Sequence, residues 1–300
     1  MWDVMSEVAS IKDAVRKQLQ LNPSLPSPLK KKYENIICKL TNYYKLDSRI
    51  FAVVLFGSLA RRQAIPSSCI DLVVFVKPQY YKNFFYVEET RERIADYAKM
   101  GGKAQRFWGA TCGLRMGREV EHTIDFNDAV VDLLFRADMV RMRDQSSICS
   151  DRFELEIGNY FVYCLPLYEQ DDTYQLMAKR YLPFYDDEIR KQRLKATRKE
   201  FDYRIYRIKK MANRELYFYC NRLFDFAFKI FLQHLFIKKR KYPYFYEKWI
   251  KQQVTDILNE PELYEKLAQT LIMPRISPEN FKAKADILRN LMREYGAKVR

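Results

Sequence analysis

Two short apolar segments limit most strongly what this chain can fold into. They are Ile50–Phe56 (IFAVVLF) and Ile70–Val76 (IDLVVFV), and both are rich in β-branched and aromatic residues. An apolar run of this length is typical of a strand that is buried on both faces. A sheet with two buried faces needs covering layers from other segments, so the sequence predicts a mixed α/β region.

The rest of this half alternates between helical and strand-like patterns. A break at 21–28 that contains three prolines separates two stretches of helical spacing. Helices are predicted at about 4–20, 29–44 and 86–99, and strands at about 104–109, 118–126, 129–135 and 160–168. Pro166 makes the last of these an edge strand, because proline cannot donate to a sheet ladder.

Beyond about residue 174 the strand-like runs end and helical spacing takes over. A wide apolar stripe between Leu216 and Leu235 suits the centre of a helical bundle. Further helices are predicted at about 246–258, 260–271 and 278–295. The predicted fold class is therefore α+β: an N-terminal helix and linker at 1–28, a small mixed-sheet domain at 29–173 and an all-helical bundle domain at 174–300.

The net charge of +15 belongs mainly to the C-terminal half. Residues 1–170 hold 24 Lys/Arg and 21 Asp/Glu, whereas residues 171–300 hold 29 and 17. The excess can be a surface for RNA or for nucleotide phosphates, or it can simply solvate the outer faces of helices. Both interpretations stay open at this point.

Cysteine and histidine usage argues against a zinc site and against a disulfide scaffold. The six cysteines form no CxxC pair, and the chain has only two histidines, His122 and His234. This pattern is typical of reduced thiols in a cytosolic protein. The first residues lack the uninterrupted apolar core of a signal peptide, and no run approaches 18 apolar residues. We therefore expect a cytoplasmic protein without a membrane partner.

The segment 53–76 carries the residues most suited to chemistry. The first buried strand ends at Gly57 and Ser58, and a short helix is predicted to follow at 59–63. Free backbone N–H groups at that turn can approach phosphate oxygens, and the Ser58 hydroxyl adds a donor. Arg61 and Arg62 can supply positive charge to a triphosphate. The next strand places the Asp71 carboxylate beside the glycine turn.

This order of strand, Gly-Ser, short helix and strand with Asp71 resembles the signature of the polymerase-beta-type nucleotidyltransferase superfamily. The resemblance implies that Asp71, a second aspartate two residues earlier and a third carboxylate on a neighbouring strand hold two Mg²⁺ or Mn²⁺ ions. Those ions bind a nucleoside triphosphate and activate an acceptor hydroxyl, and pyrophosphate leaves.

Asp132 is the candidate for the third carboxylate. It lies within the apolar run 129–135 (AVVDLLF), where a charge is costly unless it has a partner or a function. Asp125 and Asp128 are the alternatives. A carboxylate that merely faces solvent at the sheet edge also stays open.

Two residues depart from the family pattern. Cys69 stands where the family has its first aspartate, and Arg62 stands where many members have glycine. A thiol is a soft ligand and a poor substitute for a carboxylate on Mg²⁺. A natural pseudoenzyme, a weakly active or differently metallated enzyme, and a substitution that traps an inactive form are the three explanations.

Two segments of the second half bear on the substrate. Residues 238–252 resemble a segment in the helical domain of antibiotic-type and uncharacterised nucleotidyltransferases. That resemblance implies that Lys248 contacts a phosphate and that Trp249 lines the cleft, although a solvated lysine and a core tryptophan are the more ordinary interpretation. The basic segment 191–210, with Tyr203 and Tyr206, is compatible with RNA or with a solvated helix.

The predicted function is transfer of a nucleoside monophosphate, AMP in the first instance, from ATP or another nucleoside triphosphate to a hydroxyl of a small molecule, an RNA or a protein. Asp71 and Asp132 are the expected metal ligands, with Cys69 at the substituted position. Gly57, Ser58, Arg61, Arg62 and Lys248 are the expected nucleotide contacts. The alternative is a non-catalytic nucleotide- or RNA-binding protein that keeps the same fold.

Overall fold

A computed structural model describes residues 4–80, 87–108, 119–127, 129–136 and 152–296. The chain forms two compact units. Residues 1–141 and 159–179 make up the first, here called the sheet unit, and residues 142–158 and 180–300 make up the second, here called the helical unit. The chain therefore passes between the units more than once. The domain limits predicted from the sequence, at 28/29 and 173/174, stay predictions.

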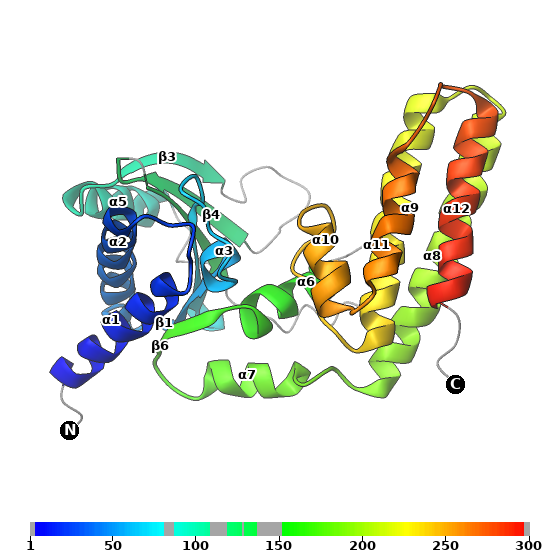
Figure 1. Cartoon of the computed structure of the whole chain (residues 1–300). Coiled ribbons are helices and arrows are strands. Elements are labelled where there is room, and N and C mark those ends of the chain that lie inside the picture. Colours follow the sequence, from blue (N-terminus) through cyan, green and yellow to red (C-terminus); the bar gives the residue numbers. More distant parts are fainter. Residues whose placement is uncertain (1–3, 81–86, 109–118, 128, 137–151, 297–300) are drawn as a thin grey trace. The chain divides into compact units, whose positions relative to one another are not determined.

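A mixed sheet of six strands lies in the described part of the sheet unit. The strands are β1 (Ile50–Phe56), β2 (Ile70–Val76), β3 (Lys103–Trp108), β4 (Glu119–Asp125), β5 (Val130–Arg136) and β6 (Leu165–Glu169). Their order is β3-β4-β5-β2-β1-β6. β2 and β5 run parallel and the other neighbours run antiparallel. This sheet and the helices that follow it confirm the predicted α+β fold class (Figure 1).

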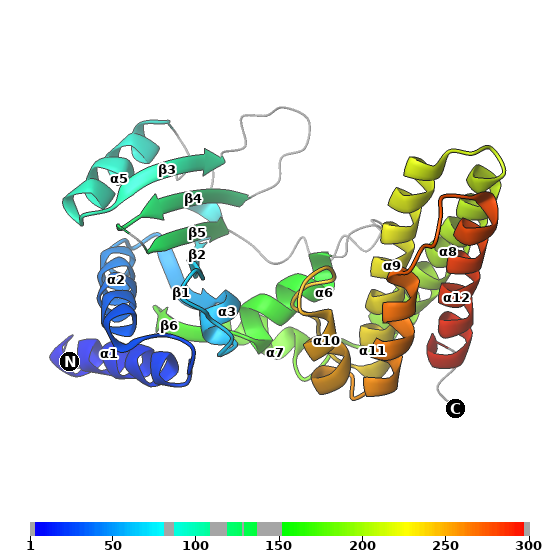
Figure 2. The ribbon, with the colours of Figure 1, turned by 45° about the horizontal axis from the view of Figure 1, so that its top comes forward.

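One face of the sheet carries the main core of this unit. The helices α1 (Val4–Gln20) and α2 (Ser27–Lys45) pack on it, and α5 (Val87–Lys99) contacts β3 (Figure 2). The buried side chains Leu55, Leu72 and Leu133 belong to this core, together with residues of both helices. All three helices were predicted from the sequence, the first two from their apolar spacing and the third from its charge and alanine pattern.

Aromatic side chains from a later part of the chain cover the opposite face. The ring centroids of Tyr160 and Tyr174 lie 6.2 and 5.8 Å from that of Phe75. This packing explains an error in the sequence analysis. The strand predicted at 160–168 begins only at Leu165, because 152–162 is helical and Tyr160 places its ring on the sheet instead of pairing with it. β6 is an edge strand, as its proline predicted.

Long helices dominate the helical unit. α8 (Asp187–Ala212), α9 (Tyr217–Lys239) and α12 (Pro278–Gly296) pack around a core that includes Phe201, Phe231 and Leu288 (Figure 1). The shorter helices are α6 (Arg152–Ile157), α10 (Ile250–Gln252) and α11 (Pro261–Ala268), and α7 (Thr173–Tyr181) precedes α8. None of the helices in the described ranges is long and apolar enough to cross a membrane.

The predicted helix at 246–258 begins only at Ile250. Trp249 adopts a left-handed backbone conformation with φ of 52°, which an α-helix cannot accommodate. The segment before it lacks regular structure, although its apolar spacing had suggested a helix.

A buried ion pair ties α6 to the long helices. The Glu154 side chain is fully buried and accepts hydrogen bonds from Arg193 Nη2 at 2.6 Å, Gln233 Nε2 at 2.9 Å and the Tyr185 hydroxyl at 3.2 Å. The guanidinium of Arg193 also lies 4.7 Å from the ring centroid of Phe153. Three elements of the helical unit therefore meet at one carboxylate.

Replacing this carboxylate should be far more costly than replacing an exposed one. Glu154→Ala should lower the free energy of unfolding by about 3 kcal/mol, because Arg193 stays buried without its counter-charge. Asp202→Ala, which removes the exposed partner of Arg198 on α8, should cost less than about 1 kcal/mol. Chemical denaturation followed by circular dichroism measures both values. Equal losses would contradict a structural role for the buried pair.

Candidate functional site

Asp71 and Asp132 lie side by side near the beginnings of two neighbouring strands. β2 and β5 pair these residues in register, so both side chains leave the same face of the sheet. Adjacent strands are about 4.8 Å apart, which brings two carboxylates within reach of one small cation. Both aspartates are half-buried, whereas their neighbours Ile70 and Val131 are fully buried. The structure thus brings together the two aspartates that the sequence analysis selected.

Gly57 lies directly against the Asp71 carboxylate. β1 ends at Phe56, which pairs with Asp71, and Gly57 follows with φ of +71°. A Cβ atom added at Gly57 would lie 1.7 Å from Asp71 Oδ2. Any side chain here would therefore displace the carboxylate, and the backbone angle also favours glycine.

The helix after Gly57 is a single turn and begins earlier than predicted. It is α3 (Gly57–Ala60) instead of 59–63. Arg62 ends it with a left-handed φ of 64°, and the Gln63 N–H donates to the Ser58 carbonyl at 2.9 Å. Ser58 is buried, Arg61 is half-buried with its Nε donating to Gln63 Oε1 at 3.2 Å, and Arg62 is exposed. Both arginines thus belong to the turn beside Asp71.

Two side chains of the N-terminal segment hold this turn, and the sequence analysis missed both. Gln18 Nε2 donates to the carbonyls of Leu59 and Ala60, each at 2.8 Å. The fully buried Asn22 donates to the Leu59 carbonyl at 3.1 Å and accepts from the Ala64 N–H at 3.0 Å. The sequence contained one sign of these contacts: Gln18 is a polar residue on the apolar face of a predicted helix, and Asn22 is a polar residue in the linker that follows. The region 1–28 therefore braces the candidate site.

Cys69 lies two residues before Asp71, at the end of a loop that α2 holds in place. The Tyr33 hydroxyl donates to the Ser68 carbonyl at 2.7 Å, and burial raises the pKa of Tyr33. Cys69 is half-buried and is not part of a disulfide. It therefore occupies the position where the resemblance implies a first carboxylate, and it supplies sulfur instead of oxygen.

A neighbouring strand orients Asp132. Thr123 pairs with it across β4 and β5, and the threonine hydroxyl donates to Asp132 Oδ1 at 2.8 Å. Asp125 lies on the same face of β4 and accepts from Gln105 Nε2 at 2.9 Å, whereas Asp128 is outside the described residues. Asp132 is thus the carboxylate that the register places directly beside Asp71.

The residues present fit one hard cation better than two. Within the described ranges, no group of three or more His, Cys, Asp or Glu side chains is arranged to hold a metal ion. Asp71 and Asp132 supply two carboxylates, and a Mg²⁺ ion commonly completes such a pair with water and phosphate oxygens. Cys69 adds a soft ligand that Mg²⁺ does not favour. Cys69 stands at the position of the first aspartate, so two of the three expected carboxylates are found among the described residues.

Neither histidine is suited to act as a general base at this turn. His122 lies on the core face of β4, where its Nδ1 is 3.1 Å from the Tyr97 hydroxyl, and burial lowers its pKa to about 3. His234 belongs to the helical unit, where burial lowers its pKa to about 4. Both are core histidines with structural partners.

Lys248 and Trp249 belong to the helical unit. The Lys248 ammonium lies 5.2 Å from the ring centroid of Phe245, and Trp249 is 39% exposed. Trp249 is therefore not a core residue, as one interpretation of the sequence had it. Contact of either side chain with a nucleotide stays a prediction.

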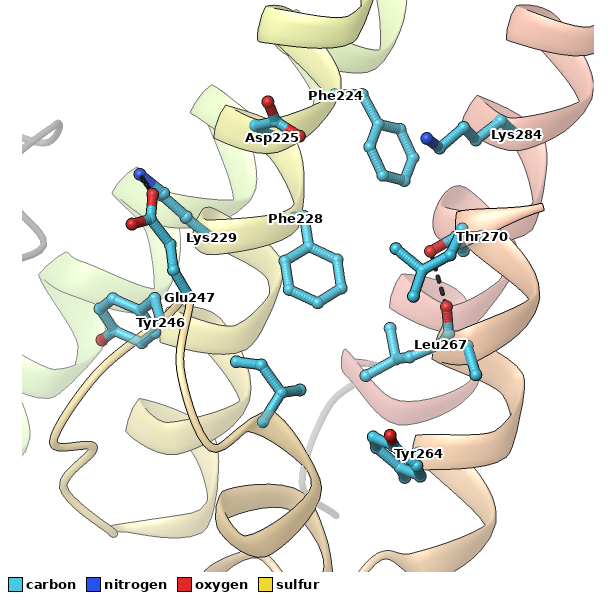
Figure 3. Close-up of a pocket in the computed structure, with 13 residues that line it drawn as sticks. Phe224, Asp225, Phe228, Lys229, Tyr246, Glu247, Tyr264, Leu267, Thr270 and Lys284 are labelled. Atoms are coloured by element: carbon cyan, nitrogen blue, oxygen red, sulfur yellow. Dashed lines mark hydrogen bonds and ion pairs between the residues drawn. The ribbon is translucent and has the colours of Figure 1, made fainter. Parts of the chain in front are cut away.

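The helical unit also contains a half-open cavity of about 450 Å³ (Figure 3). Its wall combines the rings of Phe224, Phe228 and Tyr264 with the ion pair between Lys229 and Glu247. The Lys284 ammonium lies 4.1 Å from the Phe224 ring centroid, and burial lowers the pKa of that lysine. Aromatic walls with a few polar groups are typical of small-molecule sites.

Comparisons with known proteins add little. No model of a known protein family matches the chain, and no curated protein matches it either. Among solved structures, a nucleotidyltransferase-like protein from Exiguobacterium sibiricum 255-15 is similar over 85% of this chain and 73% of its own length, at 12% identity and a TM-score of 0.44. Because this likeness is weak, the proposal below rests on the geometry at Gly57, Asp71 and Asp132.

The contact between Gly57 and Asp71 predicts a cost that a matched glycine does not share. Gly101 also has a positive φ, of +87°, but a Cβ added there meets no atom within 4 Å. Gly101→Ala should cost about 1 kcal/mol of unfolding free energy through backbone strain alone. Gly57→Ala should cost at least about 2 kcal/mol more, because the carboxylate must also move. Equilibrium denaturation of both variants checks this, and equal costs would contradict the close contact.

Proposed function

We propose that the sheet unit is a nucleotidyltransferase domain that binds a nucleoside triphosphate, ATP in the first instance, with Mg²⁺ or Mn²⁺. Its reaction is transfer of the nucleoside monophosphate to a hydroxyl of an acceptor. One observation carries the proposal: Asp71 and Asp132 stand in register on parallel strands, and a glycine without a side chain packs against the first of them. Two adjacent carboxylates beside the first N–H groups of a helical turn suit a cation and the phosphates that it binds.

Each residue has a role that its chemistry supports. Asp71 and Asp132 hold the cation, and Thr123 orients the second of them through its hydroxyl. Gly57 and Ser58 offer backbone N–H groups and a hydroxyl to phosphate oxygens. A cation held by these residues would neutralise phosphate charge and polarise the phosphorus that is attacked.

The two arginines that follow supply the positive charge of the turn. Arg61 and Arg62 balance the negative charge of the triphosphate, and Arg61 is the better placed of the two because it is half-buried.

Cys69 sets the level of activity in this proposal. A thiol leaves the cation with two protein carboxylates, so nucleotide binding is retained while transfer is slow. The acceptor is a small molecule, an RNA or a protein. Four cysteines of the described ranges are not part of a disulfide, which fits a reducing compartment, and we propose the cytoplasm as the location.

A second function from another class is a nucleotide-binding protein without catalysis. Cys69 favours it, and so does the lack of a third suitably placed ligand among the described residues. In this alternative the same turn binds the nucleotide, and the chain acts through a change in shape or partner. The two functions predict different activities for a variant in which aspartate replaces Cys69.

Cys69→Asp should therefore raise the rate of pyrophosphate release from ATP at least about tenfold, because a missing oxygen ligand of the cation is returned. The measurement is an enzyme-coupled pyrophosphate assay with a panel of hydroxyl acceptors. Cys69→Asn is the matched control: it has nearly the same shape without the charge, and it should give no gain.

Three results separate the functions. A gain that Asp71→Asn abolishes supports transfer at this site. If Cys69→Asp binds ATP with Mg²⁺ and never turns over, the non-catalytic function is correct. If the variant folds but neither binds nor reacts, the assignment of the site to nucleotides is wrong.

A further inference from the structure

Arginine and exposed aromatic side chains alternate along one face of α8 and α9. We call this surface the Arg–Tyr face, and its members are Tyr203, Arg204, Tyr206, Arg207, Tyr219, Arg222 and Phe226. The four rings are well exposed, at 49% for Tyr203, 58% for Tyr206, 40% for Tyr219 and 39% for Phe226. The two helices run side by side (Figure 1), so both contribute to one surface.

Direct contacts join the members into a continuous surface. The guanidinium of Arg204 lies 5.8 Å from the ring centroid of Tyr203 on α8 and 5.3 Å from that of Phe226 on α9. Arg207 bridges the same helices, because its guanidinium donates to the Tyr219 hydroxyl at 3.3 Å. These contacts hold the planar groups beside one another and fix their positions on the surface.

Arg222 extends this surface along α9. Its guanidinium lies 5.8 Å from the ring centroid of Phe226, which Arg204 also contacts. Positive charge therefore flanks the Phe226 ring from both helices.

The bundle does not need these rings for its core. Phe201, Ile205 and Ile208 on the same helix are fully buried and already fill the core-facing side of α8. Rings left on the opposite side cost solvation without helping the core, and a cluster of exposed aromatic residues commonly marks an interaction site. The burial pattern thus separates a structural face of α8 from a face that is free to bind.

The charge of the surface restricts what it can bind. α8 contains ten Lys and Arg residues and four Asp and Glu residues. Two acids of α8 close to Tyr203 in the sequence form ion pairs, Glu200 with Arg204 at 2.5 Å and Asp202 with Arg198 at 3.0 Å. The partner should therefore carry regularly spaced negative charge and flat groups that stack.

We propose that the Arg–Tyr face binds single-stranded RNA. Unpaired bases stack on the exposed rings, and the guanidinium groups contact the phosphates between them. A duplex hides its bases, so it would use the charges alone. RNA is favoured over DNA because the Tyr203 and Tyr206 hydroxyls can exchange hydrogen bonds with the ribose 2′-hydroxyl, a group that DNA lacks.

This binding is independent of nucleotide transfer. The Arg–Tyr face belongs wholly to the helical unit, whereas the proposed nucleotide site belongs to the sheet unit. ATP binding in the presence of Mg²⁺ should therefore stay at the wild-type level in every Arg–Tyr variant. The two proposals can fail separately.

The test is fluorescence anisotropy of the full chain with a labelled oligouridine of about 12 nucleotides, a length within the range that single-strand binding surfaces cover. Tyr203→Ala with Tyr206→Ala should weaken binding at least about tenfold, because each stacked base is worth roughly 1–3 kcal/mol. Tyr80→Ala, at another exposed tyrosine (40%) in the sheet unit, is the matched control and should change nothing.

Further variants separate the contributions of base stacking, the tyrosine hydroxyls and the arginine charge to RNA binding. Tyr203→Phe with Tyr206→Phe should keep the stacking but lose the preference for oligouridine over oligothymidine of equal length. Arg207→Gln should lower the slope of log Kd against log salt concentration, measured between roughly 50 and 200 mM salt. The decrease should be about the amount that one phosphate contact contributes. Lys17→Gln, on the exposed side of α1, should leave that dependence unchanged.

Three outcomes would overturn the proposal. They are equal affinity of the wild type and the double alanine variant, equal affinity for single-stranded and duplex RNA, and affinity for oligothymidine that matches or exceeds that for oligouridine. Circular dichroism of each variant checks that the helices are intact. Because all the replaced side chains are at the surface, the variants should fold.

Discussion

The contact between the Gly57 backbone and the Asp71 carboxylate is the constraint on which the rest of the candidate site depends. A Cβ atom at Gly57 would overlap Asp71 Oδ2, so the carboxylate keeps its place only because a glycine follows β1. The parallel register then sets Asp132 beside Asp71, and Thr123 fixes the second carboxylate. Gln18 and Asn22 stabilise the turn by donating hydrogen bonds to the Leu59 carbonyl. Two inner strands of a buried sheet thus present two carboxylates side by side near their beginnings.

Much of this arrangement could be predicted from the sequence, for identifiable reasons. Ile50–Phe56 and Ile70–Val76 are unambiguous strands because their apolar runs are short and β-branched. Alternation along 129–135 was enough to put Asp132 on the half-exposed face. The register between β2 and β5 was not predictable, because no local pattern states which distant strands become neighbours.

The errors have physical causes as well. The segment 160–168 alternates like a strand. Tyr160 is nevertheless helical and packs its ring on Phe75 instead of pairing with a neighbouring strand. Gln18 and Asn22 act through hydrogen bonds to distant carbonyl groups, which leave no periodic signal. The meaning of the excess of Lys and Arg in the second half was also ambiguous, because the sequence does not show which of the neighbouring aromatic residues are buried. The structure shows which aromatic residues of that half stay exposed, and that distinction depends on burial.

The central claim is that Asp71 and Asp132 share one cation beside the Gly57 turn. The most direct measurement is a crystal structure with Mn²⁺ and a non-hydrolysable ATP analogue, with the anomalous signal of manganese locating the ion. We expect a peak within about 2.5 Å of an oxygen of each aspartate, with a phosphate oxygen on the same ion. A manganese peak that contacts neither aspartate, with the nucleotide bound away from Gly57, would contradict the account.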